Sequence, residues 1–301
     1  MNSLTSYELT QKYRSKIKNI GMQSDVISQI KAVINGSCPD AEKLFSVEGI
    51  WAHQKLFDTN IKIKAFLFCP DFLYSNEALA LADTFLARAE NAYMVSQRVF
   101  QKLSERDKPD GLITIGQFPS YDINQLNLRT DAVVAVLDGL EKPGNIGTIL
   151  RTCDGSGVDA VFICNKKARI TNPKLIKGSM GSAFVIPIVE FKTVDDCILW
   201  LMAQNFNIYL ADSNGDKSFK CYEYAGKSAL VLGSERYGLS EQWYSSKPNI
   251  LSIPMLGICD SLNVGTAASI ILYEICMKKR ILSTCPHHKK DRACLMGLAQ
   301  V

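Results

Sequence analysis

Short apolar runs recur along the second half of the chain. The most continuous is residues 133–137, which is apolar at every position, as expected for a strand buried on both faces of a parallel sheet. Further strands are predicted at residues 158–164, 184–189, 208–211, 229–232 and 250–253. Helical spacing of apolar residues predicts helices at 194–204 and 263–279. Strands that alternate with helices in this way predict an α/β domain with a mainly parallel sheet.

The first half of the chain repeats this alternation on a smaller scale. Its predicted strands are 65–69, 93–95 and 112–115, and its predicted helices are 76–89 and 97–103. We therefore divide the chain into an N-terminal arm (residues 1–40), a small α/β domain (41–117), a linker without clear periodicity (118–130), the larger α/β domain (131–280) and a tail (281–301). In the arm, Lys12, Arg14, Lys16 and Lys18 occupy every second position, which does not follow one face of a helix. The arm is interpreted as solvated chain, with contact to RNA or to a dimer partner as the alternative.

Composition and charge exclude several classes of protein. With 301 residues, 47% of them hydrophobic and 21% charged, the chain is globular and long enough for about two domains. A net charge of +4 neither requires nor excludes a nucleic-acid partner. No apolar run approaches the ~18 residues of a membrane span, and residues 1–20 lack the apolar core of a signal peptide. Together with ten cysteines that form no CxxC pair, this predicts a cytoplasmic protein with reduced thiols.

Three segments stand out because each follows a predicted strand of the larger domain. They are residues 138–152, 233–238 and 253–264. The first combines two glycines, which permit close approach of the backbone, with Asn145 as a candidate helix cap and Arg151 six residues later. Each segment alone could be ordinary turn chemistry. Together, at the carboxyl ends of strands where α/β sheets bind ligands, they predict a functional site.

Two common nucleotide-binding motifs are absent or misplaced. The chain has no GxxxxGK phosphate loop. Residues 155–160 match GxGxxA by letter, but they follow a predicted helix and precede a strand, which is the reverse of the dinucleotide-binding context. We therefore interpret Gly155 or Gly157 as a helix C-cap, and a nucleotide-dependent oxidoreductase is disfavoured.

The histidines and the terminal cysteines offer little support for other catalytic centres. Because the only histidines are His53, His287 and His288, a Ser-His-Asp triad is not expected. The last two could form a zinc site with Cys285 and Cys294, but the spacing fits no standard pattern. We therefore expect a flexible tail and no metal.

Positive charge is concentrated in one stretch of the larger domain. Between Phe162 and Met180, five cations occur without any acidic residue: Lys166, Lys167, Arg169, Lys174 and Lys177. These side chains could be a solvated loop and helix face. Because they lie beside the glycine- and asparagine-rich strand ends, we interpret them instead as a surface that binds RNA phosphates.

The same segments resemble the motifs of the SpoU (TrmH-like) RNA ribose 2'-O-methyltransferases of the SPOUT superfamily. The first motif is matched by Pro143, Gly144, Asn145, Ile146, Gly147 and Arg151. The second is matched by Gly233, Ser234, Glu235, Gly238, Leu239 and Ser240. The third is matched by Ile253, Pro254, Met255, Ser261, Leu262, Asn263, Val264, Tyr273 and Glu274. A basic helix that leads to Ser-x-Gly is matched by Lys174, Lys177, Ser179 and Gly181, whereas Gly265 stands where relatives often have serine.

The resemblance implies a SPOUT-type α/β domain with a deep trefoil knot, in which the C-terminal segment passes through a loop. It also implies S-adenosylmethionine bound at the knot, and a homodimer with its active site near the subunit interface. Residues 44–117 are similar, more weakly, to the small substrate-binding α/β domain that precedes many SpoU catalytic domains. That domain resembles RNA-binding ribosomal proteins.

The resemblance further implies roles for individual residues. The residues expected to hold S-adenosylmethionine are Leu232, Gly233, Glu235, Gly238, Ile253, Pro254, Met255, Ser261, Leu262, Asn263 and Ala267. Those implied to orient the substrate and to hold Arg151 are Asn145, Glu235, Ser261 and Asn263. In the family, the arginine of the first motif activates the 2'-hydroxyl. Because arginine is almost always protonated, Arg151 could instead bind a phosphate and stabilise the developing alkoxide, and both roles stay open.

These inferences favour an S-adenosylmethionine-dependent enzyme that methylates ribose 2'-hydroxyls of structured RNA without a metal. Ribosomal RNA is favoured over transfer RNA because of the additional N-terminal domain, and a drug-resistance enzyme acting on the large ribosomal RNA is one form of this hypothesis. The alternatives are a transfer RNA 2'-O-methyltransferase and a non-catalytic RNA-binding or ribosome-assembly factor on the same fold. Asn145, Arg151, Glu235 and Asn263 argue against the latter, since a pure binding protein does not need the whole polar set.

Overall fold

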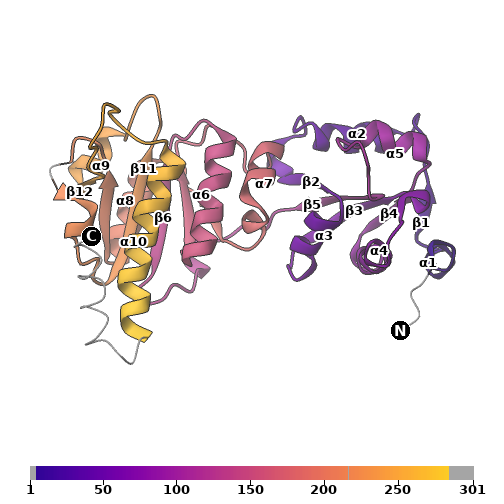
Figure 1. The fold of residues 1–301 in the computed structure, drawn as a ribbon, viewed down its shortest axis with the longest axis horizontal. Coiled ribbons are helices and arrows are strands. Elements are labelled where there is room, and N and C mark those ends of the chain that lie inside the picture. Colours follow the sequence, from indigo (N-terminus) through magenta and orange to yellow (C-terminus); the bar gives the residue numbers. More distant parts are fainter. Residues whose placement is uncertain (1–4, 216, 285–301) are drawn as a thin grey trace. The chain divides into compact units, whose positions relative to one another are not determined.

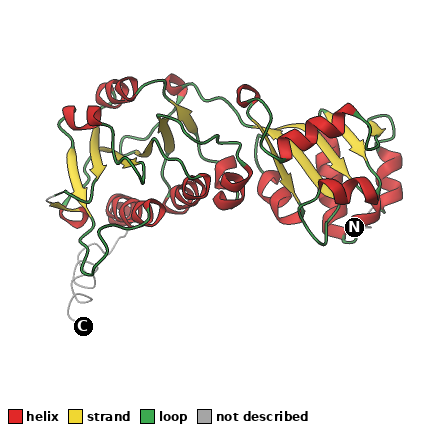
Figure 2. Cartoon of the chain, turned by 90° about the horizontal axis from the view of Figure 1, so that it is seen from above, coloured by secondary structure: helices red, strands yellow, loops and turns green. Residues whose placement is uncertain are grey.

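The computed structural model describes residues 5–215 and 217–284 (Figure 1). Within these residues the chain packs into two compact units. The first contains the residues up to Ser120 together with Arg169–Val185, and the second contains Tyr121–Ala168 and the residues from Ile186 onwards. Each unit is built around one β-sheet with helices on both faces (Figures 1 and 2).

The first unit contains a five-stranded sheet in the order β1-β4-β3-β5-β2. The strands are β1 (Ile17–Asn19), β2 (Leu44–Glu48), β3 (Lys62–Phe68), β4 (Asn91–Met94) and β5 (Leu112–Gln117). β1, β4 and β3 are parallel to one another, whereas β5 runs antiparallel to both β3 and β2. The helices are α1 (Ser6–Lys12), α2 (Asp25–Ile34), α3 (Ile50–Phe57), α4 (Asn76–Arg88), α5 (Gln97–Leu103) and α7 (Pro173–Ser179). All the elements that the sequence predicts between residues 65 and 115 are therefore present, with shifted ends.

Apolar side chains cover both faces of this sheet. On one face, α2 and α5 pack onto the strands through residues such as Ile30 and Phe100. On the other face lie α3 and α4, where Phe85 of α4 contacts Phe66 of β3 with ring centroids 5.9 Å apart (Figure 1). The sheet is thus enclosed between two helical layers, as expected for a domain with its own core.

Residues 5–40, which the sequence analysis interprets as solvated chain, are instead folded, so that interpretation is wrong for this segment. β1 extends the sheet by pairing with β4. α2 buries Ile27, Ile30 and Val33, whose spacing of three places them on one face of the helix. Lys12 forms an ion pair with Asp83 of α4, with its Nζ atom 2.7 Å from the carboxylate. The apolar spacing of α2 therefore decides the fold of this segment, rather than the alternating charges before it.

His53 on α3 is fully buried in the first unit. Its Nδ1 atom lies 2.8 Å from the carbonyl oxygen of Gly49, and its Nε2 atom lies 2.9 Å from the hydroxyl of Thr114. Burial lowers the pKa of His53 to about 4, although the hydrogen bond to Gly49 acts in the opposite direction. The ring is therefore neutral at physiological pH and serves as a hydrogen-bonding part of the core.

The lowered pKa of His53 predicts a loss of stability in acid. Below the unfolded-state pKa of about 6.5 the unfolded chain binds a proton that the folded chain does not, until the folded pKa near 4 is reached. We expect the free energy of unfolding of wild type, relative to His53→Gln, to fall by about 3 kcal/mol between pH 7 and pH 4. Denaturant titrations of both proteins across this range measure the difference. A difference that does not change with pH would show that His53 titrates normally in the folded state.

The second unit contains a seven-stranded sheet in the order β10-β12-β9-β11-β6-β7-β8, in which every recorded strand pair is parallel. The strands are β6 (Val133–Asp138), β7 (Ala160–Cys164), β8 (Ile188–Glu190), β9 (Phe206–Ala211), β10 (Lys217–Ser218), β11 (Lys227–Gly233) and β12 (Asn249–Ser252). The helices are α6 (Pro143–Ser156), α8 (Val194–Ala203), α9 (Glu241–Ser245) and α10 (Val264–Thr284). The parallel α/β domain that the sequence predicts is therefore confirmed.

Helices cover both faces of the parallel sheet. One face is packed by α8 and by Trp243 of α9, within a core that includes Phe162 and Leu210. The other is covered by α6 and α10, which lie side by side in both views and are joined by a hydrogen bond of 2.7 Å between the hydroxyls of Thr152 and Ser269 (Figures 1 and 2). No helix among residues 5–215 and 217–284 is long and apolar enough to span a membrane. The passage of the C-terminal segment through a loop stays a prediction.

The segment Arg169–Val185 falls within the predicted larger domain in sequence, but it packs in the first unit. The Arg169 guanidinium donates to the carbonyl of Cys38 at 2.7 Å. Phe184 stacks on Phe45 with ring centroids 5.1 Å apart. It lies in a short 3₁₀ helix, although the sequence predicts a strand at 184–189. The observed strand, β8, begins only at Ile188. Packing against an aromatic ring far away in sequence therefore overrides the local apolar pattern.

Candidate active site

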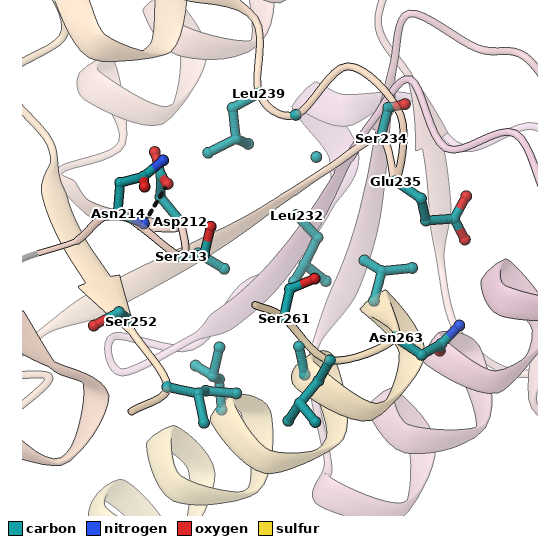
Figure 3. A pocket seen from close by; sticks show the side chains of 18 of the residues that line it. Asp212, Ser213, Asn214, Leu232, Ser234, Glu235, Leu239, Ser252, Ser261 and Asn263 are labelled. Carbon is teal, nitrogen blue, oxygen red and sulfur yellow. Dashed lines mark hydrogen bonds between the residues drawn. The ribbon is translucent and has the colours of Figure 1, made fainter. Parts of the chain in front are cut away.

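A cavity of about 650 Å³ lies at the carboxyl ends of three adjacent strands of the second unit, β12, β9 and β11, and at the start of α10. Ligands bind at this edge of parallel α/β sheets, and the volume is in the usual range for a small-molecule site. Figure 3 shows Asp212, Ser213 and Asn214 at one end of the cavity and Glu235 and Asn263 at the other. The second and third sequence motifs therefore border one cavity.

The loop after β11 closes on itself beside the cavity. The backbone N–H of Ser234 donates to the carbonyl of Gly238 at 2.9 Å, and the N–H of Gly238 donates to the carbonyl of Ser234 at 3.0 Å. Gly238 has a φ of +70°, in the left-handed region that favours glycine. Gly233 lies so close to the backbone of Gly238 that no side chain fits between them. Both glycines of the second motif are therefore required by the shape of this loop.

Asp138, at the end of β6, holds the other side of the same loop. Its buried carboxylate accepts hydrogen bonds from the Asn165 side chain at 2.7 Å, the Ser240 backbone N–H at 2.8 Å and the Trp243 indole N–H at 3.1 Å. Three donors from two separate segments, the residue after β7 and the start of α9, thus converge on one carboxylate. Charge-assisted hydrogen bonds of this kind are stronger than neutral ones, so Asp138 fixes the end of the loop that borders the cavity.

Replacing Asp138 with asparagine is expected to destabilise the second unit. The amide keeps the size of the side chain, but its NH₂ group faces donors, so at least one buried polar group loses its partner. We expect the free energy of unfolding to fall by about 1–3 kcal/mol, together with weaker binding of the cavity's ligand. Thermal and denaturant unfolding measure the first effect, and Asp195→Asn on the exposed start of α8 is the control. Wild-type stability in Asp138→Asn would contradict the structural role given to this carboxylate.

Polar side chains from all three motifs meet at one end of the cavity. The Asn145 side-chain amide donates to the Glu235 carboxylate, and the Asn263 amide donates to the side-chain oxygen of Asn145 at 3.4 Å. The ammonium of Lys142 lies 3.9 Å from the same carboxylate. The structure therefore joins residues separated by up to 118 positions into one hydrogen-bonded cluster, which we call the Asn145–Glu235–Asn263 cluster.

Asn263 also begins α10. Its side-chain oxygen accepts from the N–H of Gly265 at 2.9 Å, and its carbonyl accepts from the N–H of Ala267 at 2.9 Å. Gly265, the departure from the family pattern, is buried here, and a Cβ atom would lie 3.2 Å from both this oxygen and the Thr148 side chain. Glycine at this position therefore keeps the helix cap and its contact with α6 free of crowding.

The structure brings most of the predicted site residues to the cavity. Those that line it are Leu232, Gly233, Glu235, Gly238, Ile253, Met255, Ser261, Leu262, Asn263 and Ala267. Pro254 does not line it, and Asn145 is linked to it through its hydrogen bonds with Glu235 and Asn263. The cavity-lining set therefore combines aliphatic side chains with hydroxyl, amide and carboxylate groups.

Arg151 does not line the cavity. Arg151 is an exposed residue of α6, six residues after Asn145. This spacing places Arg151 about 9 Å farther along the helix axis than Asn145 and on a different face of the helix. Within residues 5–215 and 217–284 its guanidinium makes no hydrogen bond or ion pair. The charge of Arg151 is thus available to a molecule that approaches from outside this chain.

The lining residues that the sequence analysis did not single out include Asp212, Ser213, Asn214 and Tyr244. The Tyr244 hydroxyl donates to the Asp212 carboxylate, and burial together with this hydrogen bond raises the pKa of Tyr244 to about 12. The first three directly follow β9, so the rule that ligands bind at carboxyl ends of strands would have found them. They match no family motif, which explains why they were missed.

The five predicted RNA-binding cations are divided between the two units. Lys166 and Lys167 belong to the second unit, and Lys166 forms an ion pair of 2.9 Å with Glu190. Arg169 is used in packing within the first unit, as described above, whereas Lys174 and Lys177 of α7 are exposed there. Their role in RNA binding stays a prediction. The candidate zinc residues Cys285, His287, His288 and Cys294 lie outside the described residues.

The fold and site define an α/β protein that binds a small molecule beside a hydrogen-bonded polar cluster. Residues 132–273 match the family described as SpoU rRNA Methylase, and residues 39–114 match the MRM3-like substrate binding domain. The chain therefore contains a SpoU methylase domain, preceded by an MRM3-like substrate binding domain.

Relatives with assigned activities support this domain assignment. The chain is 28% identical over 192 residues to a 23S rRNA (uridine(2479)-2'-O)-methyltransferase of Streptomyces viridochromogenes, covering 62% of this chain and 67% of that one. It is 28% identical over 183 residues to the 23S rRNA (guanosine(2553)-2'-O)-methyltransferase RlmP of Bacillus subtilis, covering 61% and 71%. The solved AdoMet-bound rRNA methyltransferase from Sinorhizobium meliloti has the same fold, with a TM-score of 0.78 at 22% identity over 88% of this chain and 99% of that one.

Proposed function

We propose that this protein transfers the methyl group of S-adenosylmethionine to a ribose 2'-hydroxyl of ribosomal RNA in the cytoplasm. The observation that carries the proposal is the Asn145–Glu235–Asn263 cluster, in which one residue of each family motif is hydrogen-bonded at the edge of the cavity. A non-catalytic RNA-binding factor needs neither the cavity nor this cluster.

The residues that line the cavity fit S-adenosylmethionine. This cofactor combines a nucleoside with a charged amino-acid arm and a positively charged sulfur, so it needs both apolar and polar contacts. Leu232, Leu262 and Ala267 provide an apolar wall, while Asp212 and Glu235 supply negative charge at opposite ends. The volume of about 650 Å³ accommodates a molecule of this size.

When bound, S-adenosylmethionine supplies an electrophilic methyl group, and the protein has to position a ribose hydroxyl in line with it. The Asn145–Glu235–Asn263 cluster is placed to hold that hydroxyl, because its amide and carboxylate groups offer both donors and acceptors. The hydroxyl must lose its proton as it attacks. We assign Arg151 the role of stabilising the negative charge that develops on this oxygen, since its guanidinium stays protonated.

The position of Arg151 supports a homodimer as the functional form. Its side chain is exposed and does not line the cavity of its own chain. In a symmetric dimer with the active site near the interface, Arg151 of each subunit reaches the cavity of its partner. This arrangement makes both subunits necessary for each active site.

Ribosomal RNA is the proposed substrate rather than transfer RNA. Both assigned relatives named above act on 23S rRNA, and the first unit contains the region that matches a substrate-binding domain. A large structured RNA suits an enzyme with a separate unit for recognition.

The proposal is tested by incubating the protein with labelled S-adenosylmethionine and unmodified transcripts of bacterial 23S rRNA, 16S rRNA and a transfer RNA pool. We expect label in 23S rRNA, located in dinucleotides that resist alkaline hydrolysis. Label confined to transfer RNA would replace the proposed substrate, and label on a base would replace the proposed reaction. Binding of S-adenosylmethionine without transfer to any RNA would favour the non-catalytic alternative.

A further inference from the structure

The first unit contains a cavity of about 330 Å³ that lies between α7, α3 and the loop after α5. Its shape depends on close packing. Gly181, with a φ of +95°, lets the chain after α7 approach the Lys55 side chain so closely that a Cβ atom would lie 2.9 Å from it. Phe184 at the end of this segment is packed against both Phe45 and Phe118. The cavity is therefore part of the folded unit rather than a gap beside a loose segment.

An accessible aromatic ring forms one edge of this cavity. Trp51 on α3 is 39% exposed, and the ammonium of Lys55, one turn later, lies 5.7 Å from the centre of its ring. Large aromatic rings are usually buried, so a partly exposed tryptophan at a cavity edge is available to a ligand. Every nucleobase has a flat face that stacks on such a ring.

A half-buried carboxylate faces the same cavity. Glu48 of β2 accepts hydrogen bonds from the hydroxyl of Ser104 and from the backbone N–H of Glu105 at 3.1 Å. A carboxylate has about four acceptor positions, so Glu48 keeps capacity for a further donor. Burial raises the pKa of Glu48, and hydrogen bonds are electrostatically stronger in such partly buried surroundings than in water.

Two exposed lysines lie at this cavity: Lys177 lines it, and Lys55 lies beside Trp51 without lining it. Arg106 also lines the cavity but is paired with Asp110, and the exposed Glu105 lines it as well. The exposed side chains of Lys55 and Lys177 thus supply cations beside and at the cavity, whereas the Glu48 carboxylate, which lines it, supplies an acceptor. This matches a nucleotide, whose phosphate is anionic and whose base carries amino-group donors.

We propose that this cavity holds one unstacked base of the RNA substrate, stacked on Trp51, with an amino group donating to Glu48 and the adjoining phosphate close to Lys55 and Lys177. The inference rests on the proposed function, because it assigns a recognition site for that enzyme's RNA. Glu48, Trp51 and Arg106 all fall within the region that matches the substrate-binding family. Bases with amino groups are adenine, guanine and cytosine, so uracil is disfavoured.

The first test needs no methyl transfer. Trp51 is more accessible than Trp243, which is fully buried, and Trp200, which is partly buried, so quenching of tryptophan fluorescence reports on the cavity. The probes are single-stranded RNA hexamers of A, C or U. We expect the A and C hexamers to quench more than the U hexamer, and Trp51→Phe to abolish the signal. Equal quenching in wild type and Trp51→Phe, or no quenching by any hexamer, would overturn the proposal.

Glu48→Gln tests the carboxylate separately. The glutamine amide keeps one acceptor but loses the charge, so the preference for the A and C hexamers over the U hexamer should diminish. If the preference is unchanged, Glu48 does not contact the base.

The second test measures methyl transfer to 23S rRNA. Trp51→Ala should raise KM for RNA about tenfold, whereas kcat and the Kd for S-adenosylmethionine stay at their wild-type values. Trp51→Phe, which keeps a ring, should restore most of the loss. Phe57→Ala is the matched control, since Phe57 lies on the same helix, is 46% exposed and does not line the cavity.

The two tests separate failure of this inference from failure of the proposed function. Absence of methyl transfer in wild type would remove the proposed function, while the hexamer experiment still decides whether the cavity binds a base. An unchanged KM in Trp51→Ala, in an active enzyme of normal thermal stability, would show that the cavity does not contact the RNA substrate.

Discussion

Replacing Gly233 with alanine is expected to weaken binding of S-adenosylmethionine by about 10- to 100-fold. A Cβ atom at this position would lie 2.5 Å from the carbonyl carbon and oxygen of Gly238 and 2.7 Å from the backbone nitrogen of Leu239. These are backbone atoms, so no side-chain rotation relieves the clash. The loop after β11 has to move, and because this loop lines the cavity, its displacement removes cofactor contacts.

Calorimetric titration of S-adenosylmethionine into the purified variant measures this effect. Gly144→Ala is the matched control: this glycine belongs to the first motif, and a Cβ atom there meets nothing within 4 Å. We expect its cofactor affinity to remain close to wild type. Thermal unfolding of both variants shows whether Gly233→Ala stays folded. A folded variant with wild-type affinity would contradict the placement of the cofactor in this cavity.

Much of the second unit could be predicted from sequence because its signals are local. A strand buried on both faces of a parallel sheet is apolar at every position, so β6 is visible as an uninterrupted run before Asp138. The residues that follow such strands then identify the edge of the sheet where a site forms. Asp212 obeys the same rule after β9, but it belongs to no family motif and therefore gave no separate signal.

The errors arise where distant residues decide the structure. Phe184 belongs to an apolar run that predicts a strand, yet its ring stacks on Phe45, which lies 139 positions earlier in the chain. No local pattern contains that contact. In the same way, the alternating cations before residue 20 suggest solvated chain, whereas Lys12 is paired with Asp83 of α4. Tertiary partners of this kind are absent from any short window of sequence.

The Asn145–Glu235–Asn263 cluster shows what family resemblance adds to the physical pattern. Periodicity places each of the three residues after a strand, but it does not indicate that their side chains contact one another. Asp138 illustrates the opposite case: its three buried hydrogen bonds are clear in the structure, whereas the sequence shows only an acidic residue at a strand end.

Replacing Arg151 with alanine is expected to reduce kcat by about 100- to 1,000-fold, the usual effect of removing one group that stabilises a developing negative charge. The Kd for S-adenosylmethionine should not change, since Arg151 does not line the cavity. Arg151→Lys keeps the charge but lacks the planar fork of donors, so it should recover only part of the activity. Lys192→Ala, which removes an exposed cation of the second unit, is the control. Wild-type kcat in Arg151→Ala would remove this residue from the reaction.

Mixing two impaired variants, assayed at an S-adenosylmethionine concentration well below the Kd of Gly233→Ala, tests whether Arg151 acts on its own subunit or on the partner. When Arg151→Ala and Gly233→Ala chains are allowed to exchange, each mixed dimer contains one intact cavity and one intact arginine, on different subunits. If the arginine acts across the interface, these two parts form one complete active site, and random exchange should restore roughly a quarter of wild-type activity. If it acts within its own chain, every site in the mixture lacks either the cofactor or the guanidinium. The mixture would then stay as inactive as its components, and the proposed shared active site would be wrong.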